Sequence, residues 1–146
     1  MAPPPHGPRQ QPSIARALSH DPVSVGAARR FTARILSTWG ISDRIDEVLL
    51  CVSKLATNAV RHGVPDTVGI LVRLRVSDQL LRIEVHDSSP VLPEHRYPDH
   101  DSDTGRGLLL VSACADGWGV DRHVDHKVVW AEFKIDAPVT MKVIPC

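Results

Sequence analysis

Aromatic residues are scarce in this sequence, and neither sign of charge is in excess. Only 4% of its 146 residues are aromatic, and 17 lysines and arginines balance 17 aspartates and glutamates. A domain that binds DNA or RNA needs surplus basic residues to contact phosphates, and a binder of single strands also needs aromatic side chains that stack on bases. Both shortages therefore argue against a domain dedicated to nucleic acids.

The sequence also lacks long apolar runs and paired cysteines. No run approaches the roughly 18 residues of a membrane span, and the start, Met1–Pro5, lacks the basic and then apolar pattern of a signal peptide. The cysteines, Cys51, Cys114 and Cys146, are odd in number and scattered, which indicates neither a disulfide framework nor a zinc site. We therefore expect a cytoplasmic protein that does not contact a membrane.

Length and composition indicate one folded domain. A chain of 146 residues, of which 42% are hydrophobic, is able to bury a sizeable core. Residues 1–12 hold five of the 12 prolines and few apolar side chains, which is typical of a disordered leader. We expect the domain to span 13–137 and a tail to cover 138–146.

Two segments have apolar residues at helical spacing. The first is expected to begin at a cap formed by Ser24, to run to Trp39, and to end at Gly40 in the left-handed conformation. The second, capped by Ser42 or Asp43, is expected to run to about residue 62. We expect the polar face of this second helix to carry Glu47, Cys51, Lys54, Asn58 and either Arg61 or His62.

Alternation of apolar and polar residues predicts an antiparallel sheet. A short edge strand over 13–18 and a hairpin over 68–85 precede an unusually long loop, 87–105. A helix over about 106–115 then leads into a second hairpin, 118–135. The expected class is α/β, a two-layer sandwich with three helices on one face of a mostly antiparallel sheet.

Three groups of residues have the chemistry of a ligand site, and each also has an ordinary structural explanation. Lys54 and Asn58 lie four residues apart on a helix, where an amide oxygen suits Mg²⁺ and a lysine suits phosphate, or where both are simply solvated. Asp87 ends a strand, and its carboxylate accepts a ligand amine there or forms an Asx turn. The segment Gly105–Gly107 either lets backbone N–H groups approach a phosphate or forms a turn.

The order of these segments resembles that of the GHKL ATPase and kinase superfamily. Leu55–Gly63 resembles its asparagine box, and Asp87–Pro90 is similar to its first glycine box in the shortened form of actinobacterial members. Thr104–Val111 resembles its second glycine box, Ala115–Val120 follows as in those proteins, and Lys127–Glu132 is similar to their closing strand. The resemblance covers nearly the whole folded part and points to stand-alone anti-sigma-factor serine kinases of the RsbW/SpoIIAB type.

The resemblance implies a Bergerat ATP-binding fold whose ligands are ATP and Mg²⁺. In that family the box asparagine, here Asn58, binds the Mg²⁺ that bridges the phosphates, and the aspartate, here Asp87, takes the amino group of adenine. The second glycine box holds phosphate under a mobile lid, here at about 91–104. The residues of this sequence that the resemblance assigns to phosphate are Gly105, Arg106, Gly107 and Leu108.

The sequence departs from the family pattern at three places. Lys54 stands four residues before Asn58, where the family usually has the glutamate that acts as general base. An ammonium group does not take a proton at neutral pH unless its pKa falls by several units. Ser89 and Pro90 replace a glycine that lets the backbone approach adenine, and Val128 replaces a threonine that helps to hold adenine. The first departure bears on catalysis, and the other two bear on affinity.

Three functions are compatible with these residues. The first is a nucleotide-binding, kinase-like regulator of the anti-sigma type with little or no phosphate transfer. Its partners would be a sigma factor, an anti-anti-sigma (STAS-domain) protein or both, and it would be able to form a homodimer, as members of the family often do. The second is an active serine/threonine kinase of the anti-anti-sigma protein. The third is a protein-interaction module that binds no nucleotide.

Overall fold

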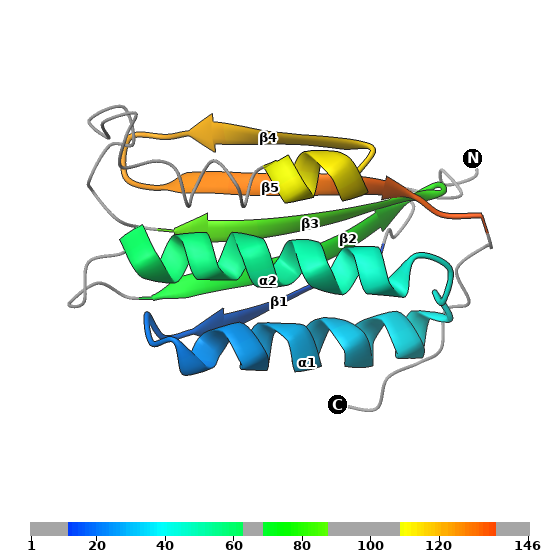
Figure 1. The fold of residues 1–146 in the computed structure, drawn as a ribbon, viewed down its shortest axis with the longest axis horizontal. Coiled ribbons are helices and arrows are strands. Elements are labelled where there is room, and N and C mark those ends of the chain that lie inside the picture. Colours follow the sequence, from blue (N-terminus) through cyan, green and yellow to red (C-terminus); the bar gives the residue numbers. More distant parts are fainter. Residues whose placement is uncertain (1–11, 63–68, 88–108, 137–146) are drawn as a thin grey trace, which may run out of the picture.

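The helices and strands form two layers, with the helices on one face of a five-stranded sheet (Figure 1). The computed structural model describes residues 12–62, 69–87 and 109–136. A helical stretch over 109–114 precedes the last two strands. The named elements are β1 (Ser13–Leu18), α1 (Val23–Trp39), α2 (Ile45–His62), β2 (Ile70–Ser77), β3 (Leu80–Asp87), β4 (Gly117–Arg122) and β5 (Lys127–Lys134). The predicted two-layer α/β sandwich is confirmed.

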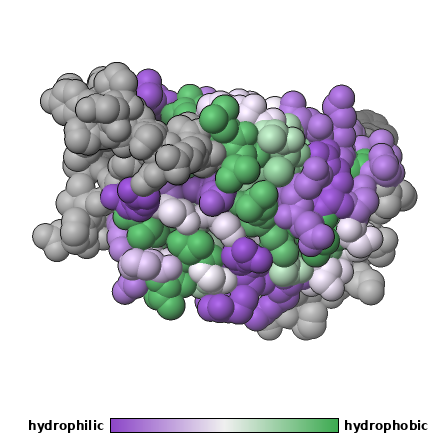
Figure 2. Space-filling model, in the orientation of Figure 1, coloured by the Kyte–Doolittle hydropathy of each residue, from purple (hydrophilic) through white to green (hydrophobic). Residues whose placement is uncertain are grey.

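Every pair of neighbouring strands is antiparallel, and the order across the sheet is β1-β2-β3-β5-β4. The last strand in the sequence, β5, therefore lies between β3 and β4. Alternate residues of each strand face the helices, and in β2 these are the buried residues Ile70, Val72, Leu74 and Val76. The sheet thus has one apolar face against the helices and one polar face. The outer surface on the helix side is a mixture of hydrophilic and hydrophobic residues (Figure 2).

The core fills the space between the sheet and the helices. Leu36 of α1, Leu55 of α2 and Phe133 of β5 are each at most 1% exposed. Burying one such side chain stabilises the fold by about 1.5–3 kcal/mol. These contacts hold α1, α2 and the sheet together as one packed unit.

The polar face of the sheet is organised around Trp130. The indole lies directly against Gly119, where an added Cβ would be 2.6 Å from the indole Cζ2. The Arg82 guanidinium lies 4.3 Å from the centroid of the Trp130 ring and donates to Glu84 at 2.8 Å and to Glu132 at 2.9 Å. Residues of this face are separated by the sheet from those that face the helices.

α1 begins at Val23, so the prediction that Ser24 caps it is wrong. Pro22 occupies the N-cap position, and the Asp21 Oδ1 accepts a hydrogen bond of 3.1 Å from the backbone N–H of Val23. Ser24 lies inside the first turn, where its hydroxyl is 3.1 Å from that of Ser19. The helix starts earlier than predicted because the ring of Pro22 fixes φ near the helical value.

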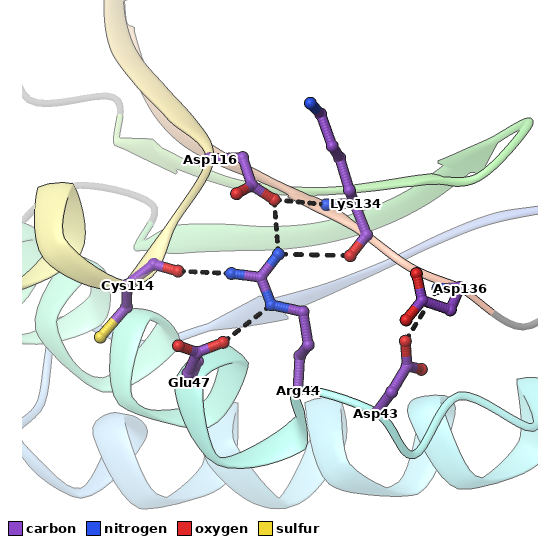
Figure 3. A network of polar contacts seen from close by, with 7 residues as sticks. All are labelled: Asp43, Arg44, Glu47, Cys114, Asp116, Lys134 and Asp136. Atoms are coloured by element: carbon purple, nitrogen blue, oxygen red, sulfur yellow. Dashed lines mark hydrogen bonds and ion pairs between the residues drawn. The ribbon is translucent and has the colours of Figure 1, made fainter.

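The junction between α1 and α2 contains one confirmed prediction and one that is wrong. α1 ends at Gly40, which is left-handed with φ 76°, as predicted. α2 begins at Ile45, later than a cap at Ser42 or Asp43 would place it. The Asp43 carboxylate instead accepts a hydrogen bond of 2.8 Å from the backbone N–H of Asp136, and so ties the start of α2 to the end of the sheet (Figure 3).

The expectation that Cys51 lies on the polar face of α2 is also wrong, because this side chain is fully buried. Cys51 lies one turn after Val48 and one turn before Leu55, and all three belong to the core. α2 packs against both α1 and the sheet, so the buried part of its surface is wider than the apolar pattern indicates. Burial raises the pKa of the Cys51 thiol to about 12, which keeps the thiol protonated and unreactive.

Arg44 joins several segments of the chain at the start of α2 (Figure 3). Its Nε donates to Glu47 at 2.7 Å, and its Nη2 donates to the carbonyl of Cys114 at 2.7 Å. Its Nη1 donates to the Asp116 carboxylate and to the carbonyl of Lys134. The same carboxylate accepts a hydrogen bond of 2.7 Å from the backbone N–H of Lys134. One side chain therefore connects α2, the end of the helical stretch 109–114, and the end of β5.

We predict that Arg44→Met lowers the free energy of unfolding by about 1–3 kcal/mol, because it removes the donors of the Cys114 and Lys134 carbonyls and the partner of Asp116. The matched control is Arg34→Met, since Arg34 is exposed on α1, and it should change stability by less than about 0.5 kcal/mol. Chemical denaturation of both variants measures the difference. Equal stability of the two variants would show that the Arg44 contacts contribute nothing.

A second prediction concerns the stability of the fold at acidic pH. The pKa of Asp116 is lowered from its usual 3.8, first by the hydrogen bond from the Lys134 backbone N–H and then by the Arg44 guanidinium. A carboxyl group whose pKa is lower in the folded chain stabilises the fold above its unfolded-state pKa, and this stabilisation is lost as the pH falls through the folded-state pKa. The stability difference between wild type and Asp116→Asn should therefore be constant near neutral pH and shrink below about pH 3.8. Urea unfolding over that range tests this, and a difference that does not change with pH would contradict it.

Candidate functional site

Two residues that the sequence assigns to a ligand lie at the same end of the molecule. The C-terminal ends of α2 and β3 and the turn between β1 and α1 are all at this end (Figure 1). Asn58 lies in the last turns of α2, and Asp87 is the last residue of β3. The antiparallel register and the direction of α2 therefore bring two distant parts of the sequence to one place.

Asp87 lies on the helix face of the sheet and is 1% exposed. Its partners in the register are Ile70 of β2 and Lys127 of β5, and it alternates with the buried residue Val85. A carboxylate withdrawn from water is stable only beside polar groups. One such group is the imidazole of His20, whose Nε2 is 3.6 Å from the Asp87 Oδ1.

His20 lies beside Asp87, a neighbour that the sequence did not reveal. It lies in the turn between β1 and α1, and its side chain is 4% exposed. Within the described part of the chain, neither of its ring nitrogens has a hydrogen-bond partner. No motif or spacing in the sequence marks this residue, because its place beside Asp87 follows from the pairing of three strands rather than from a local pattern.

Asn58 carries a buried acceptor, because its side-chain Oδ1 is closed off from water and has no hydrogen-bond partner among residues 12–62, 69–87 and 109–136. Most buried polar atoms in proteins are hydrogen-bonded, so an exception requires an explanation. A neutral amide oxygen is a good ligand for a hard cation such as Mg²⁺. Asn58 therefore fits the Mg²⁺ that the family resemblance implies.

The position of the expected general base carries Lys54, which is half-buried on α2. The nearest glutamate on this helix is Glu47, two turns earlier. The Oε1 of Glu47 accepts a hydrogen bond of 2.7 Å from Arg44. This hydrogen bond holds the Glu47 carboxylate near the start of α2, whereas Asn58 lies near the other end of the helix. Glu47 is therefore not a substitute for the missing glutamate.

The expected role of Val128 beside adenine does not fit the register. Val128 pairs with His86, whereas Asp87 pairs with Lys127. Because side chains alternate along a strand, Val128 faces the polar side of the sheet and Asp87 faces the helices. A shift of one residue along a strand moves every side chain to the opposite face of the sheet. The prediction failed because the sequence motif did not define the strand register to within one residue.

Several predicted site residues lie outside the described part of the chain. These are Ser89, Pro90, the expected lid at 91–104, and the phosphate residues Gly105, Arg106, Gly107 and Leu108. The next described residue is 109, in the helical stretch 109–114. Arg44 holds the end of this stretch by donating a hydrogen bond to the Cys114 carbonyl.

Two features are absent from the described residues. Over 12–62, 69–87 and 109–136, no helix combines the length and the apolar character that crossing a membrane requires. Within the same ranges, no three His, Cys, Asp or Glu side chains come together as ligands for a metal ion.

Known proteins share this fold. The family model of the histidine kinase-like ATPase domain matches residues 18–133. The crystal structure of the RsbU and RsbW domains of Rv1364c from Mycobacterium tuberculosis has a similar fold, with a TM-score of 0.68 and 17% sequence identity over 90% of this chain. This chain covers only 35% of that longer chain, and no curated protein matches the sequence. Because the family model covers most of the chain, the protein belongs to the histidine kinase-like ATPase family, the GHKL group that its motifs predict.

Proposed function

We propose that this protein is an ATP-binding regulator of the anti-sigma type, in which bound nucleotide rather than phosphate transfer controls partner binding. The observation that carries the proposal is the buried Oδ1 of Asn58, for which the described residues provide no hydrogen-bond partner. An amide used only for helix solubility would be exposed or hydrogen-bonded. At the asparagine of the family motif, the same oxygen would hold Mg²⁺ on the phosphates of ATP.

Asp87 supports the adenine end of this site. A carboxylate only accepts hydrogen bonds, and the amino group of adenine only donates them. Asp87 is buried at the end of β3, at the same end of the molecule as Asn58 (Figure 1). The family pairs these two residue types with the two ends of ATP, and this arrangement supports the same use here.

The phosphates would lie against Gly105–Leu108, which we assign from the sequence pattern. Backbone N–H groups at the start of a helix attract anions, since the helix dipole is positive there. The helical stretch 109–114 is fixed at its other end by the hydrogen bond from Arg44 to the Cys114 carbonyl. Lys54, one turn before Asn58 on α2, would add positive charge near the phosphates.

Regulation by binding fits the residues better than catalysis does. Lys54 replaces the glutamate that would take the proton of an attacking hydroxyl, and Glu47 is held by Arg44. ATP would then act by stabilising a partner-binding conformation, which requires that this conformation bind ATP more tightly than the others. We propose a sigma factor and a STAS-domain anti-anti-sigma protein as the partners, which would place the protein in the cytoplasm.

Nucleotide binding is the first test of the proposal. Calorimetric titration with ATP should show saturable binding that needs Mg²⁺. Asn58→Ala should weaken this binding roughly tenfold or more in Mg²⁺, because it removes a ligand of a charged ion. The matched control is Gln79→Ala, since the amide of Gln79 lies in the exposed turn between β2 and β3. No binding of millimolar ATP by wild type would refute the proposal and leave the nucleotide-free interaction module.

Lys54→Glu tests the absence of phosphate transfer. If the missing general base is what suppresses the reaction, this variant should transfer phosphate to a STAS-domain protein about 10²–10⁴ times faster than wild type. Lys54→Gln is the control, because it removes the positive charge without adding a base. Wild type that already phosphorylates its partner as fast as Lys54→Glu would instead identify an active serine kinase.

A further inference from the structure

The imidazole of His20 is a buried polar group whose hydrogen-bonding capacity is not used by the described part of the chain. Its side chain is 4% exposed, and among the described residues neither buried ring nitrogen has a hydrogen-bond partner. Its Nε2 lies 3.6 Å from the Asp87 Oδ1, which is longer than a hydrogen bond. A phenylalanine would fill such a position without the cost of burying two unsatisfied nitrogens. The nitrogens therefore point to a partner that binds there.

The position of His20 is set by the sheet. Leu18, the last residue of β1, pairs with Ile70 of β2, and Ile70 pairs with Asp87 of β3. The chain that leaves β1 is thus only two strands away from the end of β3. Gly69 allows this close approach, since a Cβ at Gly69 would lie 2.2 Å from the carbonyl oxygen of Leu18.

The turn that carries His20 is also held on its far side. The hydroxyls of Ser19 and Ser24 lie 3.1 Å apart, and the Asp21 carboxylate accepts a hydrogen bond of 3.1 Å from the Val23 backbone N–H. These contacts fix the residues immediately before and after His20. The ring therefore faces Asp87 as part of an ordered turn.

We propose that His20 is a second adenine-binding residue, which contacts the ring nitrogen next to the amino group that Asp87 takes. This inference rests on the proposed function of the site. An imidazole carries at least one N–H donor in either protonation state. Asp87 and His20 thus present an acceptor and a donor side by side, and the amino edge of adenine presents the complementary donor and acceptor.

Guanine fits the same pair poorly. It carries a carbonyl oxygen where adenine carries the amino group, and this acceptor would face the Asp87 carboxylate. Neither His20 nor Asp87 is exposed enough for water to satisfy it easily, so a mismatched base leaves buried groups without partners. The pair would therefore select ATP over GTP.

The test compares His20→Phe with wild type by calorimetric titration of ATP, GTP and inorganic tripolyphosphate, each with Mg²⁺. Phenylalanine keeps a ring of similar size and removes both nitrogens, and a cooperative thermal transition shows that the variant is folded. ATP affinity should fall roughly tenfold or more, the preference for ATP over GTP should narrow, and tripolyphosphate binding should not change. His20→Asn, which restores a donor, should recover part of the ATP affinity.

The matched control is His86→Phe. His86 is adjacent to Asp87 in the sequence, but it faces the polar side of the sheet, where its Nε2 is 2.8 Å from Glu84. This variant should bind ATP as wild type does. ATP binding by His20→Phe at the wild-type affinity and selectivity would overturn the role of His20 while leaving the proposed function intact. Absence of ATP binding by wild type would overturn both. If His20→Phe does not fold, undiminished ATP affinity and selectivity in both His20→Asn and His20→Gln would also overturn the inference.

Discussion

The Arg44 side chain is the contact on which the geometry of the site depends. It bonds to the carbonyls of Cys114 and Lys134 and to the carboxylates of Glu47 and Asp116. Through these bonds the start of α2 is fixed to the helical stretch 109–114. Asn58 lies near the other end of α2. Apolar packing alone lets helices slide by fractions of a turn, whereas a guanidinium with several directional partners defines one position.

The two faces of the sheet separate two kinds of chemistry. Asp87 lies on the helix face, at the end of β3, and His20 lies beside it in the turn between β1 and α1. Both side chains are buried. The polar face carries Trp130, Arg82 and their carboxylate partners. Because the sheet lies between them, the polar face is able to change without altering the candidate site, and this division suits the proposed binding of both a nucleotide and a partner protein.

Periodicity predicted the architecture well, because helix and strand patterns report directly on burial. The family motifs name Asn58 and Asp87 as ligand residues, and the fold places both at one end of the molecule. Ser24 and Cys51 were misplaced since a proline and tertiary packing override local preference. Val128 and His20 depended on strand register, which no local pattern defines.

The place of β5 in the sheet has a consequence for biosynthesis. β5 is the last of the five described strands to be synthesised, yet it pairs with both β3 and β4. Until it arrives, β3 has an unpaired edge beside Asp87, and β4 has no neighbour among the described strands. Such open edges pair readily with other chains. The end of the sheet that carries Asp87 is therefore closed on both sides only after β5 has been synthesised.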